Sequence, residues 1–532
     1  MSIDKIGILC YKELDNSFVE LLMKSTREVN MEDRGIIHKL NKIVNFRPFV
    51  LLAIFLLLGV AVSAVSRNSG VLFILFLVAP ILLGIVFLIR KHKFIAISLF
   101  TFVIGFCLFF VSFTMAMVEP ISRENAFIEG RVKSVVRPHV YVIEDVCLAG
   151  EELTRDVELK ANVDLEIGEL ITFRGDIEAL EENPFSTYYM SKFSMGVGYS
   201  ASSDSVNVVG KDELGFYEKI QVALKDVTTE YMGEEASSVV RSLLIGDKSG
   251  LSYELKEDMS ISGLSHLFSV SGLHVAFLCA VIFFIARILR LSDIASLSLA
   301  TVILVFYGFL TGFPAGIVRA SVMCIASLVA NSVYRRYDPL SALALAVIVM
   351  TFIDPTSLFQ LGFQMSFTAV LGIICFYPMF RRGYRGKFNK FPTKLLDAVN
   401  VSLSANSIML AVMASAFGSF SVYFILANLI AVPYTSLIYS LLMLVMPIIL
   451  IFPALGVILY PVKYLIIGFT AFSHFVATLP GASVSFVMPL VGALVYAFTL
   501  IFTSDFIMVD NKYKKIYLPA GLLLSVICTF IA

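Results

Sequence analysis

The sequence predicts a polytopic α-helical membrane protein with about 13 transmembrane helices and one small extracytoplasmic β domain. Hydrophobic residues make up 58% of the 532 residues and the mean hydropathy is +0.86, whereas soluble proteins are roughly 45–50% apolar. Apolar runs long enough to cross a bilayer recur on both sides of one segment that alternates polar and apolar residues. The net charge is zero, so the chain lacks the overall basic bias of many nucleic-acid-binding proteins.

Residues 1–47 carry eight basic and seven acidic side chains, which is typical of a solvated extension. The first apolar run begins only after them, so we expect a retained anchor and no cleavable signal peptide. Three spans are predicted within residues 48–118: Phe49–Val65, Val71–Ile89 and Phe94–Met117. The loop at 90–93 is basic, which places it and the N-terminus in the cytoplasm and the segment after Met117 outside.

The exterior segment 119–215 reads as a small β domain, because β-branched residues alternate with polar ones at period two. A five-stranded barrel and a sandwich both fit this pattern. The predicted strands are R-V-K-S-V-V-R, V-Y-V-I-E, V-E-L-K-A-N-V-D-L and E-L-I-T-F-R-G-D-I. Asn183-Pro184 interrupts the alternation. Residues 216–262 follow as an amphipathic helical connector.

Residues 263–532 contain ten further predicted spans. Basic clusters such as Arg335-Arg336 and the 381–390 run all fall on the cytoplasmic side of this arrangement, which supports it. The run at 422–452 is too long for one straight span and contains Pro433, so we expect one crossing plus a re-entrant piece. The spans are 264–288, 292–311, 316–334, 339–353, 358–380, 397–417, 422–452, 456–478, 486–505 and 515–531.

Common cofactor and metal motifs are missing from the sequence. There is no G-x-x-x-x-G-K-[ST] loop, so energy for any transport must come from a gradient or a partner. The six histidines are too dispersed for a zinc site, and we expect no metal and no cofactor. The seven cysteines are scattered singly, and five lie in apolar runs, which favours a role as small buried hydrophobes.

Polar residues gather at the start of the 264–288 span, in G-L-S-H-L-F-S-V-S-G-L-H-V at Gly263–Val275. Such groups in a membrane helix usually face a protein interior or a water-filled path, because lipid offers no hydrogen-bond partner. On one regular helix His266 and His274 would lie roughly 12 Å apart along the axis, and Ser271 would share a face with His274. Together with Gly272 they predict a polar ribbon, although hydrogen bonding that only holds a bundle together explains them equally well.

Three later spans also carry polar side chains at membrane depth. Arg319 is costly there, and Gln364 and Asn428 follow in the 358–380 and 422–452 spans. Each residue alone is typical of hydrogen bonding between helices. Together they favour a polar path through the bundle.

The Gly263–Val275 segment resembles the signature of the ComEC family, bacterial competence proteins that form the inner channel for DNA uptake. That signature commonly reads G-L-S-H-L-L-A-I-S-G-L-H-V, from which this chain departs at Phe268, Ser269 and Val270. Four further segments resemble family motifs in the same order: L-L-I-G-D-K-S at Leu243–Ser249, T-G-F-P-A-G-I-V-R-A at Thr311–Ala320, D-P-T-S-L-F-Q-L-G-F-Q-M-S-F at Asp354–Phe367 and A-N-L-I-A-V-P at Ala427–Pro433.

The resemblance implies an OB-like fold for 119–215 and a competence-type channel domain for 263–532. It implies a non-enzymatic channel in the bacterial inner membrane that translocates single-stranded DNA into the cytoplasm during natural transformation. The residues expected to line the channel or form its motifs are Asp247, His266, Ser271, Gly272, His274, Arg319, Gln364 and Asn428.

The expected partners are single-stranded DNA, membrane lipid, a cytoplasmic motor and a DNA receptor. Full-length family members often carry a metallo-β-lactamase-like domain whose histidines this sequence lacks, so we expect a separate nuclease to degrade the strand that is not imported. The oligomeric state stays open.

Two other functions fit part of the sequence. A solute or ion permease could use the same scaffold, and it would have a closed polar pocket of substrate size. An intramembrane hydrolase could use Ser271 as nucleophile and His274 as base, although such dyads usually draw on separate elements with a distinct oxyanion site.

The basic-loop asymmetry makes a prediction about topology. Single cysteines introduced at Ser202 and Lys387 should be labelled by an impermeant thiol reagent from the outside and from the cytoplasmic side, respectively. The native cysteines are first replaced by serine or alanine, and permeabilised cells give the total labelling. Equal labelling of both positions in intact cells would reject the topology and the direction of transport with it.

Overall fold

The computed structural model describes residues 47–531, apart from 68, 116–119, 182, 184–185, 269, 271, 385–392 and 505–510. The predicted extension 1–47 therefore lies outside the described residues except for Arg47. The described chain divides into two compact units, residues 47–110 and the remainder. Each is described by itself.

The first unit consists of α3 (Pro48–Ser66), α4 (Gly70–Ile89) and most of α5 (Lys93–Met115). Helices α3 and α5 cross at two glycines. A Cβ atom added to Gly59 would lie 2.1 Å from the Phe102 carbonyl oxygen, and one added to Gly105 would lie 2.2 Å from that of Leu56. Small residues therefore allow the two backbones to touch, as is typical of membrane helices.

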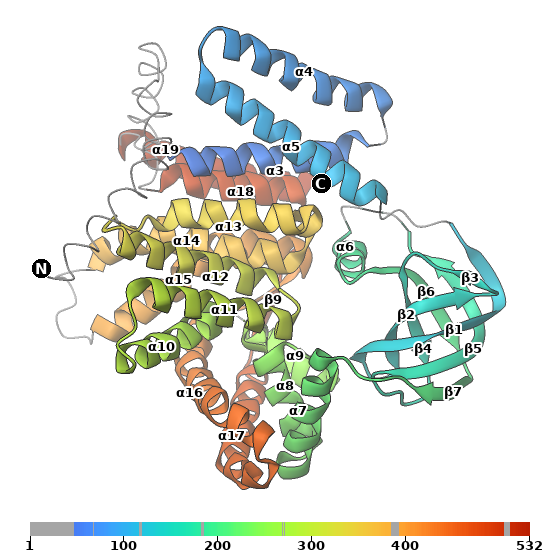
Figure 1. The fold of residues 1–532 in the computed structure, drawn as a ribbon. Coiled ribbons are helices and arrows are strands. Elements are labelled where there is room, and N and C mark those ends of the chain that lie inside the picture. The colour runs from blue at the N-terminus through green and yellow to red at the C-terminus, as the bar shows by residue number, and fades with distance from the viewer. Residues whose placement is uncertain are drawn as a thin grey trace, which may run out of the picture. The chain divides into compact units, whose positions relative to one another are not determined.

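The second unit begins with a β-barrel (Figure 1). Its strands are β1 (Ser122–Arg137), β2 (Val140–Leu148), β3 (Glu151–Glu152), β4 (Asp156–Ala161), β5 (Glu169–Ala179), β6 (Val197–Ser203) and β7 (Val206–Lys211). The order β1-β2-β4-β6-β5 closes through pairing of β5 with β1, and only β4–β6 is parallel. Strand β3 also pairs with β2, and strand β7 pairs with β5. The five strands therefore form a closed barrel, which is one of the two folds that the alternating sequence pattern predicted. The other fold, a sandwich, is excluded.

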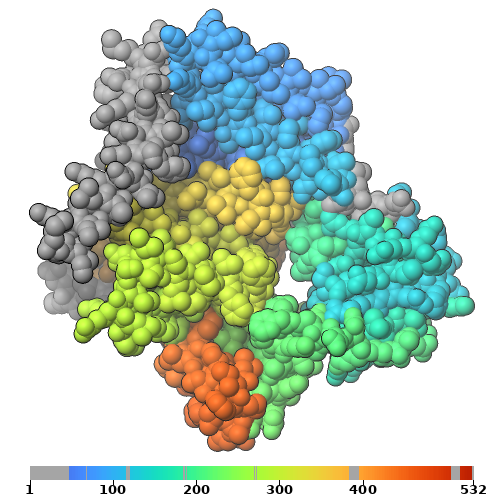
Figure 2. Space-filling model, viewed as in Figure 1, coloured from blue at the N-terminus to red at the C-terminus, as the bar shows by residue number. Residues whose placement is uncertain are grey.

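The barrel has its own hydrophobic core. Ile128, Ile143, Phe173 and Tyr199 point inward from different strands and are nearly inaccessible to solvent. The Tyr141 hydroxyl donates a hydrogen bond to the Val163 carbonyl oxygen at 2.6 Å. The space-filling view shows one face of the barrel, coloured from blue-green to green (Figure 2).

Helices α7 (Phe216–Met232), α8 (Glu234–Ile245) and α9 (Tyr253–Ile261) follow the barrel. They occupy the segment predicted as an amphipathic connector, and in α8 every residue from Ala236 to Ile245 is buried. Small residues along α8 let neighbours approach it from all sides. It shares a hydrophobic core with α7, α16 and α17.

The remaining helices form the apolar bundle of the second unit. They are α10 (Gly272–Ile288), α11 (Asp293–Thr311), α12 (Ala315–Ser332), α13 (Pro339–Ile353), α14 (Leu361–Tyr384), α15 (Thr393–Ala416), α16 (Phe424–Ile451), α17 (Leu459–Ala477), α18 (Leu490–Thr503) and α19 (Asn511–Ile531). Short 3-10 helices precede α14 (Pro355–Phe359) and α17 (Pro453–Ile458). Strands β8 (Ser419–Ser421) and β9 (Ser483–Ser485) pair as a small ribbon.

Within the described residues, nine helices are long and apolar enough to cross a membrane. Four shorter apolar segments, in α10, α13, α18 and α19, have between 10 and 17 residues. A multi-pass membrane protein is therefore supported, whereas the total of about 13 spans remains a prediction.

The 422–452 run differs from its predicted form. It contains one continuous 28-residue helix, α16, with Pro433 and Pro447 inside it, and no re-entrant piece. Nearby hydroxyl groups bond to carbonyls of the same helix, as Thr435 Oγ1 does to Ala431 O at 2.8 Å. In an apolar environment a proline inside a continuous helix costs less than a break in the helix. A break would leave several backbone N–H and C=O groups without hydrogen-bond partners. At about 42 Å, α16 exceeds a bilayer core of roughly 30 Å.

Arg131 of β1 connects the barrel to α7. Its guanidinium donates to Glu218 of α7 at 2.6 and 3.0 Å and also bonds to Glu144 of β2. The Arg131 hydrogen bond lowers the pKa of Glu218, and the Glu218 hydrogen bond raises the pKa of Arg131. Both side chains are mostly buried, so this pair is stronger than a surface ion pair.

The Arg131–Glu218 pair predicts a pH-dependent attachment of α7 to the barrel. Because the folded-state pKa of Glu218 is lowered, its stabilisation is present above the usual carboxyl range and is lost as pH falls through the lowered value. At pH 7, Glu218→Gln should cost about 2 kcal/mol of local stability and speed hydrogen exchange in β1 and α7.

A matched control is Lys211→Gln, which breaks an exposed ion pair with Glu166 on the same barrel and should change little. Once the pH is below the lowered pKa of Glu218, the wild-type protein should exchange like Glu218→Gln. Equal exchange of the wild type and Glu218→Gln at pH 7 would contradict the assigned role.

Candidate functional site

The Gly263–Val275 segment folds as two separate elements. Gly263 has a φ of +77° and follows α9, and a 3-10 turn at Ser265–Phe268 comes next. Helix α10 begins only at Gly272. The prediction of one regular helix carrying both histidines is therefore wrong, because the left-handed glycine ends one helix before the next begins. His266 lies on the turn and is exposed, and Ser271 lies outside the described residues.

His274 is buried in an aromatic network, with 4% of its surface exposed. Its ring stacks on Tyr439 of α16, with ring centroids 4.0 Å apart and planes 22° apart. The Tyr439 hydroxyl donates to the Tyr307 hydroxyl at 3.3 Å, and Tyr307 donates to the Leu244 carbonyl oxygen at 3.1 Å. This network links α10, α16, α11 and α8.

Arg319 lies on α12, close to the beginning of α10 and to α14. It is 8% exposed, and Nη1 donates a hydrogen bond to the Ser366 carbonyl oxygen. A Cβ atom added to Gly272 would lie 2.9 Å from Arg319 Nη2, so a larger residue there would displace the end of the arginine side chain. One turn before Arg319 on α12, a Cβ atom added to Gly316 would lie 3.2 Å from the Val270 carbonyl oxygen.

The charge of Arg319 has no acidic counterpart nearby. Among the residues that the structure describes, no carboxylate lies within ion-pair distance of its guanidinium. A buried cation that is solvated only by neutral groups attracts anions strongly. This arrangement therefore suits transient contact with a negatively charged group.

Gln364 and Arg319 both lie near the beginning of α14, but their hydrogen bonds in the described residues go to different groups. Its Nε2 donates to the Leu358 carbonyl oxygen at 3.0 Å and so braces the turn before the helix. The same turn is held by Asp354, which accepts from the backbone N–H of Thr356 at 2.9 Å and from Gln360 Nε2 at 2.6 Å. This network positions α14 and thereby the Ser366 carbonyl group.

Asp247 belongs to a different buried site. It lies 3.6 Å from Arg241 of α8, which is 4% exposed and also donates to Glu234 at 2.9 Å. A Cβ atom added to Gly250 would lie 2.5 Å from Arg241 Nη2, so the G-D-K-S-G turn wraps closely around the guanidinium. We assign Asp247 the role of neutralising this arginine.

Asn428 is buried near the beginning of α16. Its Oδ1 has no hydrogen-bond partner among the described residues, and neither has the Ser421 hydroxyl one turn before the helix. Unsatisfied buried polar groups are rare in proteins and commonly mark functional positions.

The structure thus joins Gly272 to Arg319 and places the other predicted residues in separate networks. Gly272 and His274 are two residues apart, which puts them on roughly opposite sides of α10. Sequence reasoning missed Ser366, Tyr307 and Tyr439. The tyrosines could have been noticed as hydroxyl groups within apolar spans, but a backbone carbonyl carries no sequence signal.

Comparison with known proteins gives two matches. The family model described as "Competence protein" matches residues 243–508. Over 207 residues the chain is 28% identical to "ComE operon protein 3" of Bacillus subtilis (strain 168). This alignment covers 39% of the chain and 26% of that protein, so the chain spans about a quarter of the length of the curated relative. No solved structure matches the chain.

The fit between Gly272 and Arg319 predicts a graded response to added methyl groups. Gly272→Ala should displace the end of a flexible side chain and lower the free energy of unfolding by about 1–2 kcal/mol. Gly372→Ala should be more severe, because its Cβ would lie 2.3 Å from the Ser404 backbone carbonyl oxygen, which cannot yield.

The matched control is Gly362→Ala in α14, where nothing lies within 4 Å of the new methyl group. Thermal unfolding of the full chain in detergent ranks the three variants. If Gly272→Ala unfolds at the same temperature as Gly362→Ala, the close approach to Arg319 is not present.

Proposed function

The chain belongs to the competence protein family, and on that premise we propose that it is an inner-membrane channel that passes single-stranded DNA into the cytoplasm during DNA uptake. The N-terminus is cytoplasmic in this proposal and the barrel lies outside. A cytoplasmic motor or a gradient drives the strand, and a DNA receptor delivers it. The protein itself acts as a conduit and not as an enzyme.

The observation that carries the proposal is the uncompensated charge of Arg319. A translocating strand presents one phosphate per nucleotide, and a fixed cation at membrane depth lowers the cost of moving each phosphate through an apolar region. One cation gives weak and repeated contacts, which suit passage better than tight binding. The carbonyl of Ser366 orients the guanidinium without neutralising it.

The barrel does not fit the role of gathering phosphates. Residues 122–211 contain nine Lys and Arg but sixteen Asp and Glu side chains. Five of the nine basic groups already bond within the second unit: Arg131, Lys133, Arg155, Lys192 and Lys211. A surface that gathers phosphates needs an excess of basic groups, and on this barrel the excess is acidic. We therefore assign strand contact to the helical part.

A solute or ion permease is the second candidate, and the close packing around Arg319 favours it. A Cβ atom added to Gly272 would lie 2.9 Å from Arg319 Nη2, and one added to Gly316 would lie 3.2 Å from the Val270 carbonyl oxygen, so the starts of α10 and α12 are packed closely together. In a DNA conduit, the same helices must separate to an opening on the order of 10 Å before a strand can pass. The two functions therefore differ in whether α10 and α12 must move apart.

Uptake of labelled DNA by cells that carry single variants tests the proposal. Arg319→Glu should reduce uptake by at least about tenfold, because it places a like charge beside passing phosphates. Arg335→Glu, a matched charge reversal in an exposed loop, should retain most uptake. Membrane levels of each variant are measured in parallel.

Ser271→Ala separates the conduit from a hydrolase. It should be mild in a channel, since little bulk changes, whereas a nucleophile could not be replaced and would react with a serine-directed probe. Normal DNA uptake by a deletion strain, with a defect in solute transport instead, would overturn the DNA channel in favour of the permease.

A further inference from the structure

A cavity of about 380 Å³ lies between the end of α10, the beginning of α11 and the end of α12. Its polar lining includes Arg287, Asp293, Ser296 and Asn331, and Phe283 and Leu328 form part of its apolar lining. Cavities of this size with an apolar wall and a few polar groups are typical of small-ligand sites. None of these residues belongs to the site around Arg319.

Two polar side chains of this cavity, those of Arg287 and Asn331, are available to a ligand in the described part of the chain, whereas the Ser296 hydroxyl donates to the Ser292 carbonyl oxygen at 2.9 Å. Within the described part of the chain, Arg287 forms no ion pair and the side chain of Asn331 forms no hydrogen bond. Asp293 lines the same cavity but lies beyond ion-pair distance of Arg287. An arginine and an amide with free donors can bind an anionic oxygen group.

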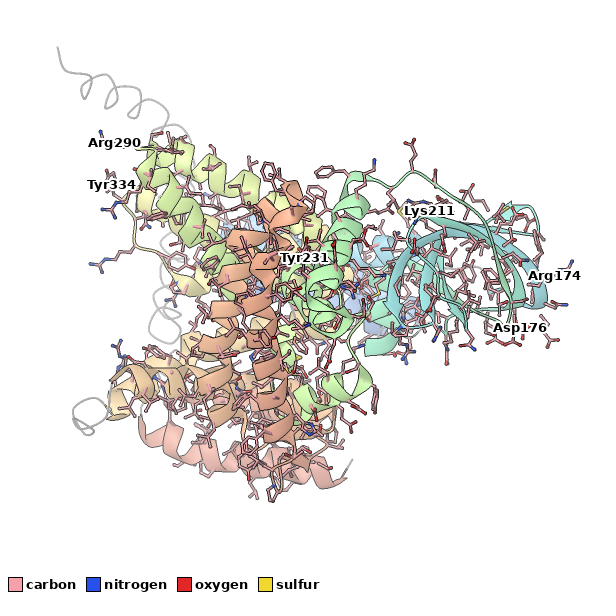
Figure 3. All side chains as sticks on the ribbon, turned by 90° about the horizontal axis from the view of Figure 1, so that it is seen from below. Arg174, Asp176, Lys211, Tyr231, Arg290 and Tyr334 are labelled. Atoms are coloured by element: carbon pink, nitrogen blue, oxygen red, sulfur yellow. The ribbon has the colours of Figure 1, made fainter. Side chains whose placement is uncertain are left out.

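The surroundings of the cavity are basic and lie at one end of three apolar helices. Arg290 follows α10, and Arg335 and Arg336 follow α12, and all three are exposed. Figure 3 shows Arg290 and Tyr334 at the same end of the helices. The helix surface next to this basic end is apolar. Phe284 of α10, for example, is 67% exposed.

We propose that this cavity binds the phosphate-bearing headgroup of an anionic phospholipid, with the phosphate on Arg287 and Asn331 and the acyl chains along the apolar surface of α10 and α11. Basic pockets between the ends of membrane helices commonly hold anionic lipid headgroups. A soluble phosphate ester offers the same chemistry but would leave the exposed apolar surface beside the cavity uncovered. The site is independent of the DNA channel proposal.

Fluorescence quenching gives a direct test, because the chain contains no tryptophan. Phe283→Trp introduces a single tryptophan at the cavity of the full-length protein, and its emission is excited selectively over that of the 21 tyrosines. In vesicles, phosphatidylglycerol with brominated acyl chains should quench it more efficiently than brominated phosphatidylcholine, with about a fivefold preference. A tryptophan at the exposed position Phe498 of α18, away from α10 and α11 in the sequence, reports the bulk lipid and should show no preference.

Two charge variants separate a specific site from general attraction. Arg287→Gln in the Phe283→Trp background should abolish the preference for phosphatidylglycerol. Arg335→Gln removes the same charge at the same end of the helices, outside the cavity lining, and should leave the preference intact. Equal loss in both variants, or equal quenching by both lipids in the parent, would overturn the proposal.

Competition identifies the source of the phosphate. Millimolar glycerol phosphate should not reduce quenching by phosphatidylglycerol, because it lacks acyl chains. If glycerol phosphate or a single-stranded oligonucleotide displaces the lipid completely, the cavity binds soluble phosphate or DNA, and the lipid assignment is wrong.

Discussion

The buried guanidinium of Arg319 sets the main constraint on the helical part of this protein. Removing an arginine from water is costly, and a membrane interior supplies no replacement for its hydration. The Ser366 carbonyl oxygen accepts from Nη1, and the lack of a side chain at Gly272 leaves room for Nη2. Since no carboxylate in the described residues neutralises the charge, the site remains electrostatically unsatisfied. An anion that reaches Arg319 would form the ion pair that the described residues do not supply.

Several other features follow from this constraint. The Ser366 carbonyl is in place because α14 begins at a turn held by Asp354 and Gln364. Helix α10 must start at Gly272, so the segment before it forms a separate turn. On the opposite side of α10, His274 packs on Tyr439 and anchors the helix to α16. The signature segment therefore combines one position that accommodates a charge with one that fixes the helix.

Residue patterns predicted the parts of this structure that depend on local composition. Period-two alternation located β1, β2, β4 and β5, and hydropathy located the apolar helices. The continuity of α16 through Pro433 was not predictable, because it depends on the cost of breaking a helix in an apolar environment. The burial of α8 was missed because its serines look solvent-exposed until packing covers them. Gly272 and Arg319 were both noted in the sequence, but their contact depends on how α10 and α12 cross.

Photocrosslinking of a strand in transit tests the central claim most directly. A benzoylphenylalanine residue replaces Ser366 beside Arg319 or, as a lipid-facing control, Phe284 on α10. Cells are supplied with labelled DNA whose trailing end is blocked, so that the strand is arrested in the membrane. The account predicts a DNA adduct at position 366 and none at 284. Uptake that proceeds without an adduct at 366, or with equal adducts at both positions, would contradict it.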